Sequence, residues 1–201
     1  MQLGILGAGN IGGTLARRLA EHGHSIFVGV RDPASPKAQA VAGAGVRLGS
    51  LAEAAAFGEV VIVALPLDAA LAALPALDLA GKILIDTTNA FGGAPAGFGS
   101  AAAAVAHAAG GARIAKAFNA TPWEVLADPI YGGVAVETFI CGDDPPAKQA
   151  AIQLAHDLGV VPVDVGGIAS APLTENFARF WGLLAYQAGY GRGFAFKMLT
   201  R

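Results

Sequence analysis

The 201-residue sequence has few of the residues that build covalent cross-links or metal centres. Cys141 is the only cysteine, so no disulfide can form within the chain and a cysteine-rich metal site is excluded. The histidines His22, His24, His107 and His156 are scattered, without the spacing of a zinc site. We therefore expect no bound metal.

Charge is also scarce: charged residues make up 14% of the chain, and the formal net charge is -2. No run of like charges is present, so we expect no binding to nucleic acid. Glycine, proline or a charge interrupts every apolar run before it reaches the length of a membrane span. The N-terminus begins with a strand-like LGIL rather than a basic leader. These features predict a cytoplasmic protein without membrane contact.

Apolar residues reach 54% of the chain, and their pattern alternates between strand-length runs and helix-length segments. The run VVIVAL does not alternate in polarity, which predicts a strand buried on both faces. The expected strands are 3–6, 25–30, 46–48, 60–65, 83–86, 113–117, 134–141 and 160–163. The expected helices are 11–21, 33–42, 50–56, a helix starting at 66, 100–109, 145–158 and 173–187. This order predicts an α/β fold with a doubly wound, mostly parallel sheet of the Rossmann type. We expect one nucleotide-binding domain over 1–201, with 165–201 as a C-terminal helical and dimerisation extension.

The segment GAGNIG follows the first strand and opens the first helix, the context that a dinucleotide-binding turn requires. Gly7 would form the tight turn, Gly9 would let a pyrophosphate approach the backbone, and Gly12 would let the helix pack against the strand. Asn10 and Ile11 would supply backbone N–H groups at the helix N-terminus. The alternative is a glycine-rich turn without a ligand.

The end of the second strand, VGVRDPASPK, indicates which dinucleotide is bound. An acidic residue at this place selects NAD, whereas a basic residue binds the 2′-phosphate of NADP. Asp32 precedes Pro33, and this pair is typical of a helix N-cap and first turn. Arg31 is then free to pair with a phosphate, with Lys37 as a second cation. We therefore expect NADP, although Arg31 could also be a solvated surface residue.

The carboxyl ends of the other strands carry the remaining candidates. The backbone of ALP at 64–66 is expected to flank the cofactor, and the segments DTTNAF and KAFNATP bring Asn89 and Asn119 to the same edge. Either asparagine could instead be an ordinary turn residue. The predicted cofactor-binding set is Gly7, Gly9, Asn10, Ile11, Gly12, Arg31, Lys37, Ala64, Leu65, Pro66, Asn89, Ala117 and Asn119.

Together these segments resemble the coenzyme F420-dependent NADP oxidoreductase family. The resemblance rests on GAGNIG, VGVRDP, VALP, IDTTN, AKAFNA, CGDD and the endings LGVVPVDVG and GFAFKML. It implies a dimeric enzyme that moves hydride between NADP(H) and a deazaflavin. The family typically has Gly-Ser-Arg where this chain has Gly29-Val30-Arg31, so one hydroxyl that would bind the 2′-phosphate is missing. Eukaryotic metalloreductase relatives use a similar domain to deliver electrons to a flavin.

Hydride transfer between two stacked rings needs little acid–base chemistry, because the cofactors carry the reactivity. We accordingly predict no catalytic side chain. His107 lies in an alanine-rich segment, His156 lies at a helix end, and Cys141 is expected to be a small core residue.

An acceptor site is expected over the same edge of the sheet, walled by the loop at 117–123 and the C-terminal helices. The possible aromatic wall consists of Trp123, Phe177, Phe180 and Trp181. The spacing of the last three residues is equally typical of a core or dimer helix. The cations available for an anionic acceptor are Arg179, Arg192, Lys197 and Arg201.

Three functions remain open from the sequence. The first is an NADPH-dependent oxidoreductase with a deazaflavin or flavin acceptor. The second is an NADPH-dependent reductase of a small imine or keto compound, although the chain lacks the long helical second domain that such enzymes commonly use. The third is a non-catalytic NADP-binding sensor that recruits a partner.

Overall fold

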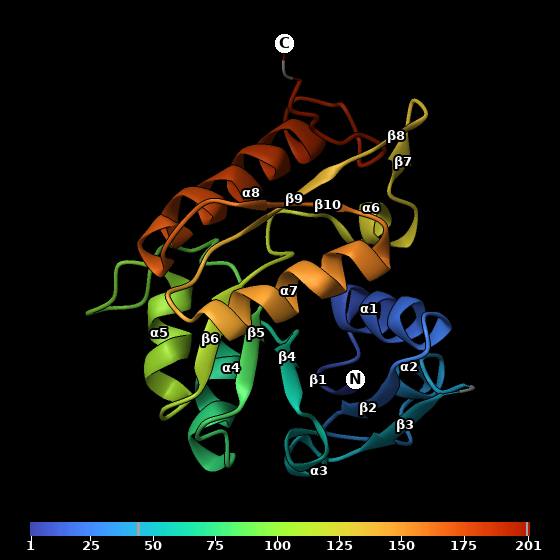
Figure 1. The fold of residues 1–201 in the computed structure, drawn as a ribbon, viewed down its shortest axis with the longest axis vertical. Coiled ribbons are helices and arrows are strands. Elements are labelled where there is room, and N and C mark those ends of the chain that lie inside the picture. The colour runs from blue at the N-terminus through green and yellow to red at the C-terminus, as the bar shows by residue number, and fades with distance from the viewer. Residues whose placement is uncertain (44, 200) are drawn as a thin grey trace.

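The centre of the protein is a parallel sheet with the strand order β3-β2-β1-β4-β5-β6 (Figure 1). We describe it from a computed structural model that covers residues 1–43, 45–199 and 201. Its strands are β1 (Gln2–Leu6), β2 (Ser25–Gly29), β3 (Val46–Gly49), β4 (Val60–Val63), β5 (Ile83–Asp86) and β6 (Arg113–Lys116). The winding direction reverses between β1 and β4, which confirms the predicted doubly wound Rossmann fold.

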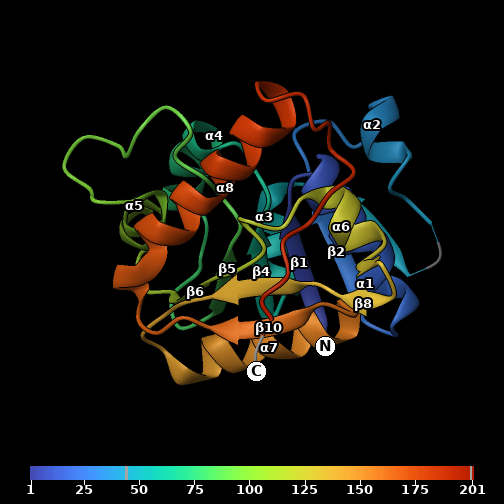
Figure 2. The same ribbon diagram turned by 90° about the horizontal axis from the view of Figure 1, so that it is seen from above.

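Helices cover both faces of this sheet (Figure 2). The helices on one face are α1 (Asn10–Glu21), α6 (Trp123–Ala127) and α7 (Pro145–Leu158), and those on the other are α3 (Leu51–Phe57), α4 (Leu67–Ala73) and α5 (Ala101–Ala108). A single 3-10 turn, Leu74–Ala76, follows α4. In β4, Val60 and Ile62 join the first core, whereas Val61 and Val63 join the second. This two-sided burial is the reason why the strand does not alternate in polarity.

A second, smaller layer follows β6 in the sequence. β9 (Glu137–Ile140) and β10 (Val161–Asp164) form a parallel pair, and β7 (Ile130–Tyr131) and β8 (Val134–Ala135) form a short hairpin. An antiparallel bridge between Cys141 and Lys116 connects this layer to β6. The layer thus extends the fold beyond the end of the central sheet.

The chain ends with α8 (Ala171–Tyr186), after a 3-10 turn at Ile168–Ser170. In Figure 1 this helix lies at the upper end of the molecule, and the segment after it folds back along the helix. Phe194 stacks on Trp181 with 5.3 Å between ring centroids, so aromatic packing holds the returning segment. Within the expected C-terminal extension, 165–201, the α-helix therefore spans only Ala171–Tyr186. No helix in the described part of the chain is long and apolar enough to cross a membrane.

Two predicted elements differ in the structure. The helix expected at 33–42 is only α2 (Pro36–Gln39), because Ser35 rather than Asp32 is its N-cap and Pro36 occupies the first turn. The strand expected at 134–141 is divided into β8 and β9, because the chain changes its pairing partner at Val136. The backbone N–H of Val136 donates to Pro129, while its carbonyl accepts from Val161.

Candidate functional site

The turn between β1 and α1 requires glycine at two of its three marked positions. Gly7 has a φ of +109°, and a Cβ there would lie 2.6 Å from the carbonyl oxygen of Ala64. A Cβ at Gly12 would lie 2.0 Å from the carbonyl oxygen of Gly7. Both contacts are too short for any side chain, so these glycines allow the tight turn and the close approach of α1 to the sheet.

Gly9 differs from the other two glycines, because a Cβ there would meet no heavy atom within 4 Å. It is the N-cap of α1 and has no side chain to cap the helix. The first backbone N–H groups of α1, including those of Asn10 and Ile11, therefore have no partner within the helix. Open space in front of free N–H groups at a helix N-terminus fits a phosphate group. The residues present thus fit the pyrophosphate of a dinucleotide.

The end of β2 lies directly beside this turn, since the N–H of Gly7 donates to the carbonyl of Gly29 over 2.8 Å. Arg31 follows two residues later and is exposed. Lys37 lies in α2 and is also exposed. Within residues 1–43, 45–199 and 201, neither cation forms an ion pair. Both side chains remain available to an anionic ligand.

Asp32 does not cap α2, contrary to the sequence-based prediction. Its Oδ1 accepts a hydrogen bond from the backbone N–H of Ala34 over 2.9 Å, and its backbone carbonyl accepts from the hydroxyl of Ser35. Ser35 then caps α2 through the N–H of Ala38. Asp32 therefore stabilises a local turn just before the helix, which is still a structural role.

The segment 64–66 flanks the glycine turn, as its position after β4 suggests. The N–H of Ala64 donates to the carbonyl of Leu6, and a Cβ on Gly7 would lie 3.1 Å from the side chain of Leu65. Pro66 is the N-cap of α4. This backbone therefore lies at the carboxyl edge, next to the turn that fits the pyrophosphate.

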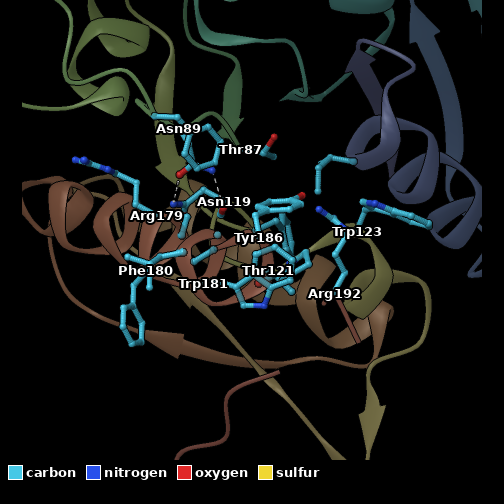
Figure 3. A pocket seen from close by; sticks show the side chains of 18 of the residues that line it. Thr87, Asn89, Asn119, Thr121, Trp123, Arg179, Phe180, Trp181, Tyr186 and Arg192 are labelled. Carbon is cyan, nitrogen blue, oxygen red and sulfur yellow. Dashed lines mark hydrogen bonds between the residues drawn. The ribbon is translucent and has the colours of Figure 1, made fainter. Parts of the chain in front are cut away.

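Asn89 and Asn119 meet at the ends of β5 and β6 (Figure 3). The Nδ2 of Asn89 donates to the backbone carbonyl of Asn119 over 2.7 Å, and the Nδ2 of Asn119 donates to the Oδ1 of Asn89 over 2.9 Å. Phe118, just before Asn119, has a φ of 61°, which is rare outside glycine. Ala117 is fully buried, and its backbone N–H donates to the backbone carbonyl of Asp86 over 3.0 Å.

The oxygen Oδ1 of Asn119 is buried and has no hydrogen-bond partner among the described residues. Because both hydrogen bonds of the pair fix the amide orientations, Asn119 presents an acceptor rather than a donor. An unpaired buried acceptor is costly, which indicates a place for a ligand that donates a hydrogen bond.

A cavity of about 960 Å³ adjoins the asparagine pair and the start of α1. It is lined by Asn10, Ile11, Thr87, Asn89, Phe91, Phe118, Asn119, Ala120, Thr121, Pro122, Trp123, Asn176, Ala178, Arg179, Phe180, Trp181, Gly182, Leu183, Tyr186, Gln187 and Arg192. Four of the predicted cofactor residues, namely Asn10, Ile11, Asn89 and Asn119, thus line it. The others lie along the same edge or beneath it and do not line the cavity.

Aromatic residues from the start of α6 and from α8 form much of the cavity wall. Trp123 and Trp181 line it, and Phe180 lines it at the rim, where it is half exposed. Phe177 does not line it, because its ring packs against Phe139 and Phe196 at centroid distances of 5.2 and 4.9 Å. The helix thus has an aromatic face toward the cavity and a second aromatic contact with the returning C-terminal segment.

Arg192 closes one side of the cavity, opposite the asparagine pair in Figure 3. Its guanidinium donates to both carboxylate oxygens of Glu124, with 2.8 Å for the Nη2–Oε2 contact. It also lies 5.1 Å from the ring centroid of Trp181 and 5.4 Å from that of Tyr186. Of the other cations, Arg179 lines the cavity, whereas Lys197 donates to the carbonyl of Ala135 outside it.

Beneath the cavity lies a buried ionic cluster of Asp86, Lys116 and Glu175. The ammonium of Lys116 lies 2.8 Å from Oδ2 of Asp86 and 3.2 Å from Oε1 of Glu175, and it donates to the carbonyl of Thr88 over 2.7 Å. Asp86 and Lys116 are 0% exposed and Glu175 is 5% exposed. Removing one member of such a buried pair typically costs about 3–5 kcal/mol.

Sequence reasoning assigned no role to these three residues. The signal was present, because Asp86 and Lys116 are charged residues that directly follow apolar strand residues, Ile85 and Ala115. Thr87, Tyr186 and Gln187 of the cavity wall were also not singled out.

Three side chains considered in the sequence, His107, His156 and Cys141, lie outside this site. His107 packs against Phe98 with 5.4 Å between ring centroids, and His156 is exposed on α7. Burial raises the pKa of the Cys141 thiol to about 11, which keeps it protonated and poorly nucleophilic. None of the three lines the cavity.

Known proteins share both the sequence motifs and the fold. Residues 2–90 match the family model described as NADP oxidoreductase coenzyme F420-dependent. The metalloreductase STEAP3 of Rattus norvegicus is 34% identical over 181 residues, which cover 87% of this chain and 36% of that protein. The chain therefore spans about a third of the length of this curated relative.

Two solved structures show how far the likeness extends. A candidate F420-dependent NADP reductase from Arthrobacter sp. FB24 superimposes with a TM-score of 0.85 and 29% identity, covering 100% of both chains. A reductive aminase from Aspergillus terreus, in complex with NADPH4, cyclohexanone and allyl amine, has a TM-score of 0.71 and 25% identity, covering 94% of this chain and 62% of that one. The sequence motifs and these comparisons thus agree on an NADP-dependent oxidoreductase that resembles the coenzyme F420-dependent NADP oxidoreductase family, whose model matches residues 2–90.

Proposed function

We propose that this protein transfers hydride between NADP(H) and a flat ring acceptor, a deazaflavin such as coenzyme F420 or a flavin. The observation that carries the proposal is the continuity of the glycine turn with the cavity. Asn10 and Ile11 belong to the N-terminus of α1 and also line the cavity wall. An extended dinucleotide bound at the turn therefore has its other end directed toward an aromatic-lined space.

The residues of this chain divide the recognition of NADP(H) among them. The N-terminus of α1 binds the pyrophosphate, and Arg31 with Lys37 binds the 2′-phosphate. The free Oδ1 of Asn119 accepts a hydrogen bond from the carboxamide of the nicotinamide, which is a donor of matching chemistry. When bound, NADPH supplies the hydride, and the protein supplies orientation and exclusion of water.

The chemistry of the cavity wall favours transfer between two rings. Among its lining residues, the ionisable side chains are Arg179, Arg192 and Tyr186, so no carboxylate, histidine or lysine is available as an acid or base. The volume of about 960 Å³ and the rings of Trp123 and Trp181 suit a large planar molecule. Arg179 and Arg192 offer positive charge to an acceptor with an anionic tail.

Reduction of a small imine or keto compound is the second candidate. It is supported by the likeness to the Aspergillus terreus reductive aminase, of which this chain covers 62%. Protonation of the product would have to come from Tyr186 or from water, because the lining holds no other suitable acid.

One panel of experiments separates these functions. NADPH and NADH are titrated by quenching of tryptophan fluorescence, and the NADPH complex is then mixed with F420, with FMN, or with cyclohexanone and allyl amine. The proposal predicts tighter binding of NADPH and bleaching of F420 or FMN. Turnover of the ketone and amine alone would support the second candidate, and binding without any turnover would support an NADP sensor.

A further inference from the structure

The buried cluster Asp86–Lys116–Glu175 connects the elements that form the cavity walls. Asp86 ends β5 and directly precedes Thr87, Lys116 ends β6 three residues before Asn119, and Glu175 in α8 directly precedes Asn176. Each charged residue is thus at most three positions away from a residue that lines the cavity.

The cluster holds the turn after β5 through the backbone N–H and the backbone carbonyl of one residue, Thr88. Oδ1 of Asp86 accepts from the N–H of Thr88 over 2.8 Å, and the ammonium of Lys116 donates to the carbonyl of the same residue over 2.7 Å. Thr88 lies between Thr87 and Asn89, both of which line the cavity. These contacts fix the backbone from which the asparagine pair is presented.

Glu175 attaches the opposite wall to the same ammonium. Its Oε1 lies 3.2 Å from Nζ of Lys116, and its two oxygens accept from the backbone N–H groups of Ala101 and Ala102 over 3.0 and 3.2 Å. Those N–H groups form the N-terminus of α5, whose dipole stabilises the carboxylate. Through Glu175, α8 is therefore linked to the same ammonium that holds the residue before Asn89.

We propose that Lys116 and Glu175 are positioning residues that fix the spacing between the nicotinamide side of the cavity, formed by 87–89 and 118–119, and the acceptor side, formed by α8. The ammonium contacts three separate elements: it donates hydrogen bonds to Asp86 at the end of β5 and to Thr88 in the turn after it, and it forms an ion pair with Glu175 in α8. A hydrophobic residue of equal size would fill the space without specifying this spacing. This inference rests on the proposed function, because it assigns the two sides to two ring systems.

The test uses Glu175→Gln, which keeps the size of the side chain and leaves the Asp86–Lys116 pair intact. The matched control is Leu154→Ala in α7, a fully buried residue that does not line the cavity and whose loss lowers stability. For each variant we would measure melting temperature, the affinities for NADPH and for 2′,5′-ADP, and the single-turnover rate of acceptor reduction. The second ligand lacks the nicotinamide half and reports only on the turn and Arg31.

We expect Glu175→Gln to slow hydride transfer by about tenfold or more, since small misplacements of reacting groups are costly. The affinity gap, which is the ratio of the affinity for NADPH to the affinity for 2′,5′-ADP, should narrow by about threefold. The affinity for 2′,5′-ADP itself should change little. Leu154→Ala should lower the melting temperature. Its hydride-transfer rate and its ratio of NADPH affinity to 2′,5′-ADP affinity should stay within about twofold of the wild type.

An unchanged affinity gap in Glu175→Gln, or an equal loss in Leu154→Ala, would overturn the positioning role. So would a wild type that binds both ligands equally. The gap is measured without any acceptor, so a wild type that transfers no hydride would contradict the proposed function alone.

Discussion

At the scale of single residues, the glycines of the first turn have separable roles. A Cβ on Gly12 would collide with the backbone of Gly7, whereas a Cβ on Gly9 would enter open space. The fold therefore requires Gly12, and we propose that Gly9 is needed for the ligand rather than for the fold. The three-glycine motif in the sequence predicted these roles, because they follow from backbone geometry that any Rossmann turn shares.

We predict that Gly9→Ala folds normally and loses NADPH binding. The added methyl group meets no protein atom within 4 Å but occupies the space in front of the helix N-terminus. Gly12→Ala is the matched comparison, and it should lower the melting temperature, because its Cβ would lie 2.0 Å from a carbonyl oxygen. Thermal melts and NADPH titrations check both variants. A destabilised Gly9→Ala that still binds NADPH would contradict this division of roles.

Arg31 is the residue on which we propose that the preference for NADP depends. We predict that Arg31→Ala weakens NADPH binding by about ten- to a hundredfold, the loss expected for hydrogen bonds to a charged group of about 1.5–3 kcal/mol. NADH binding should change little, because NADH has no 2′-phosphate. Lys37→Ala should have a smaller effect. If both dinucleotides weaken equally in Arg31→Ala, the arginine does not select the phosphate.

At the scale of elements, the sequence predicted the N-terminal half better than the C-terminal half. The strands from β1 to β6 are short apolar runs with clear breaks, so local pattern and topology agree. The division of 134–141 into β8 and β9 depends on pairing with distant segments, which local pattern does not reveal. The same holds for the segment after α8, whose place is set by aromatic contacts such as Phe194 on Trp181.

The candidate site was predictable to a similar degree. Asn89 and Asn119 were found from their positions at strand ends, and the cavity beside them could not be seen without α8. Asp86 and Lys116 occur in the sequence motifs, but only the fold shows that Glu175 from α8 completes their cluster. Charges separated by many residues become partners only through tertiary packing.

The contact between α6 and the C-terminal segment should depend on pH. Burial of Glu124 is the largest single effect and acts to raise its pKa, but the hydrogen bonding from Arg192, a hydrogen bond from its own backbone N–H and the positive charge of Arg192 together hold the pKa below its ordinary value of 4.5. A carboxylate with a lowered folded-state pKa contributes stability at neutral pH, and this contribution is lost as the pH falls through the folded-state value. Because both side chains are partly exposed, the effect on global stability is small.

We therefore predict an acid transition in the fluorescence of Trp181, which lies against Arg192, at a pH below the ordinary glutamate range. The variant Glu124→Gln removes the titrating group and should lack this transition while keeping its fold at neutral pH. Circular dichroism in the far ultraviolet provides the control for folding. A transition that persists unchanged in Glu124→Gln would contradict the assignment.

At the scale of the whole molecule, α8 leaves several apolar side chains in solvent. Leu173 is 71% exposed, Phe180 50% and Leu183 45%. Exposed apolar groups that gather on one helix are typical of an interaction surface. Together with the resemblance to a dimeric family, this distribution leads us to propose a homodimer with α8 at its interface.

We predict a mass near twice the 20.1 kDa of one chain in light scattering coupled to size exclusion. Leu173→Lys, which lies outside the cavity, should shift the mass toward that of one chain. Gln149→Lys on the exposed side of α7 is the control and should leave the mass unchanged. A wild type with the mass of one chain would contradict the proposed dimer and leave the nucleotide site untouched.

The most direct test of the account is to follow the hydride itself from one ring to the other. The protein would be mixed with NADPH carrying deuterium at the transferable position of the nicotinamide, and the acceptor would be analysed by mass spectrometry. We predict reduced deazaflavin that carries one deuterium at its receiving carbon, formed only when the protein is present. Failure to form reduced deazaflavin, or its formation without the label, would contradict direct transfer across this cavity.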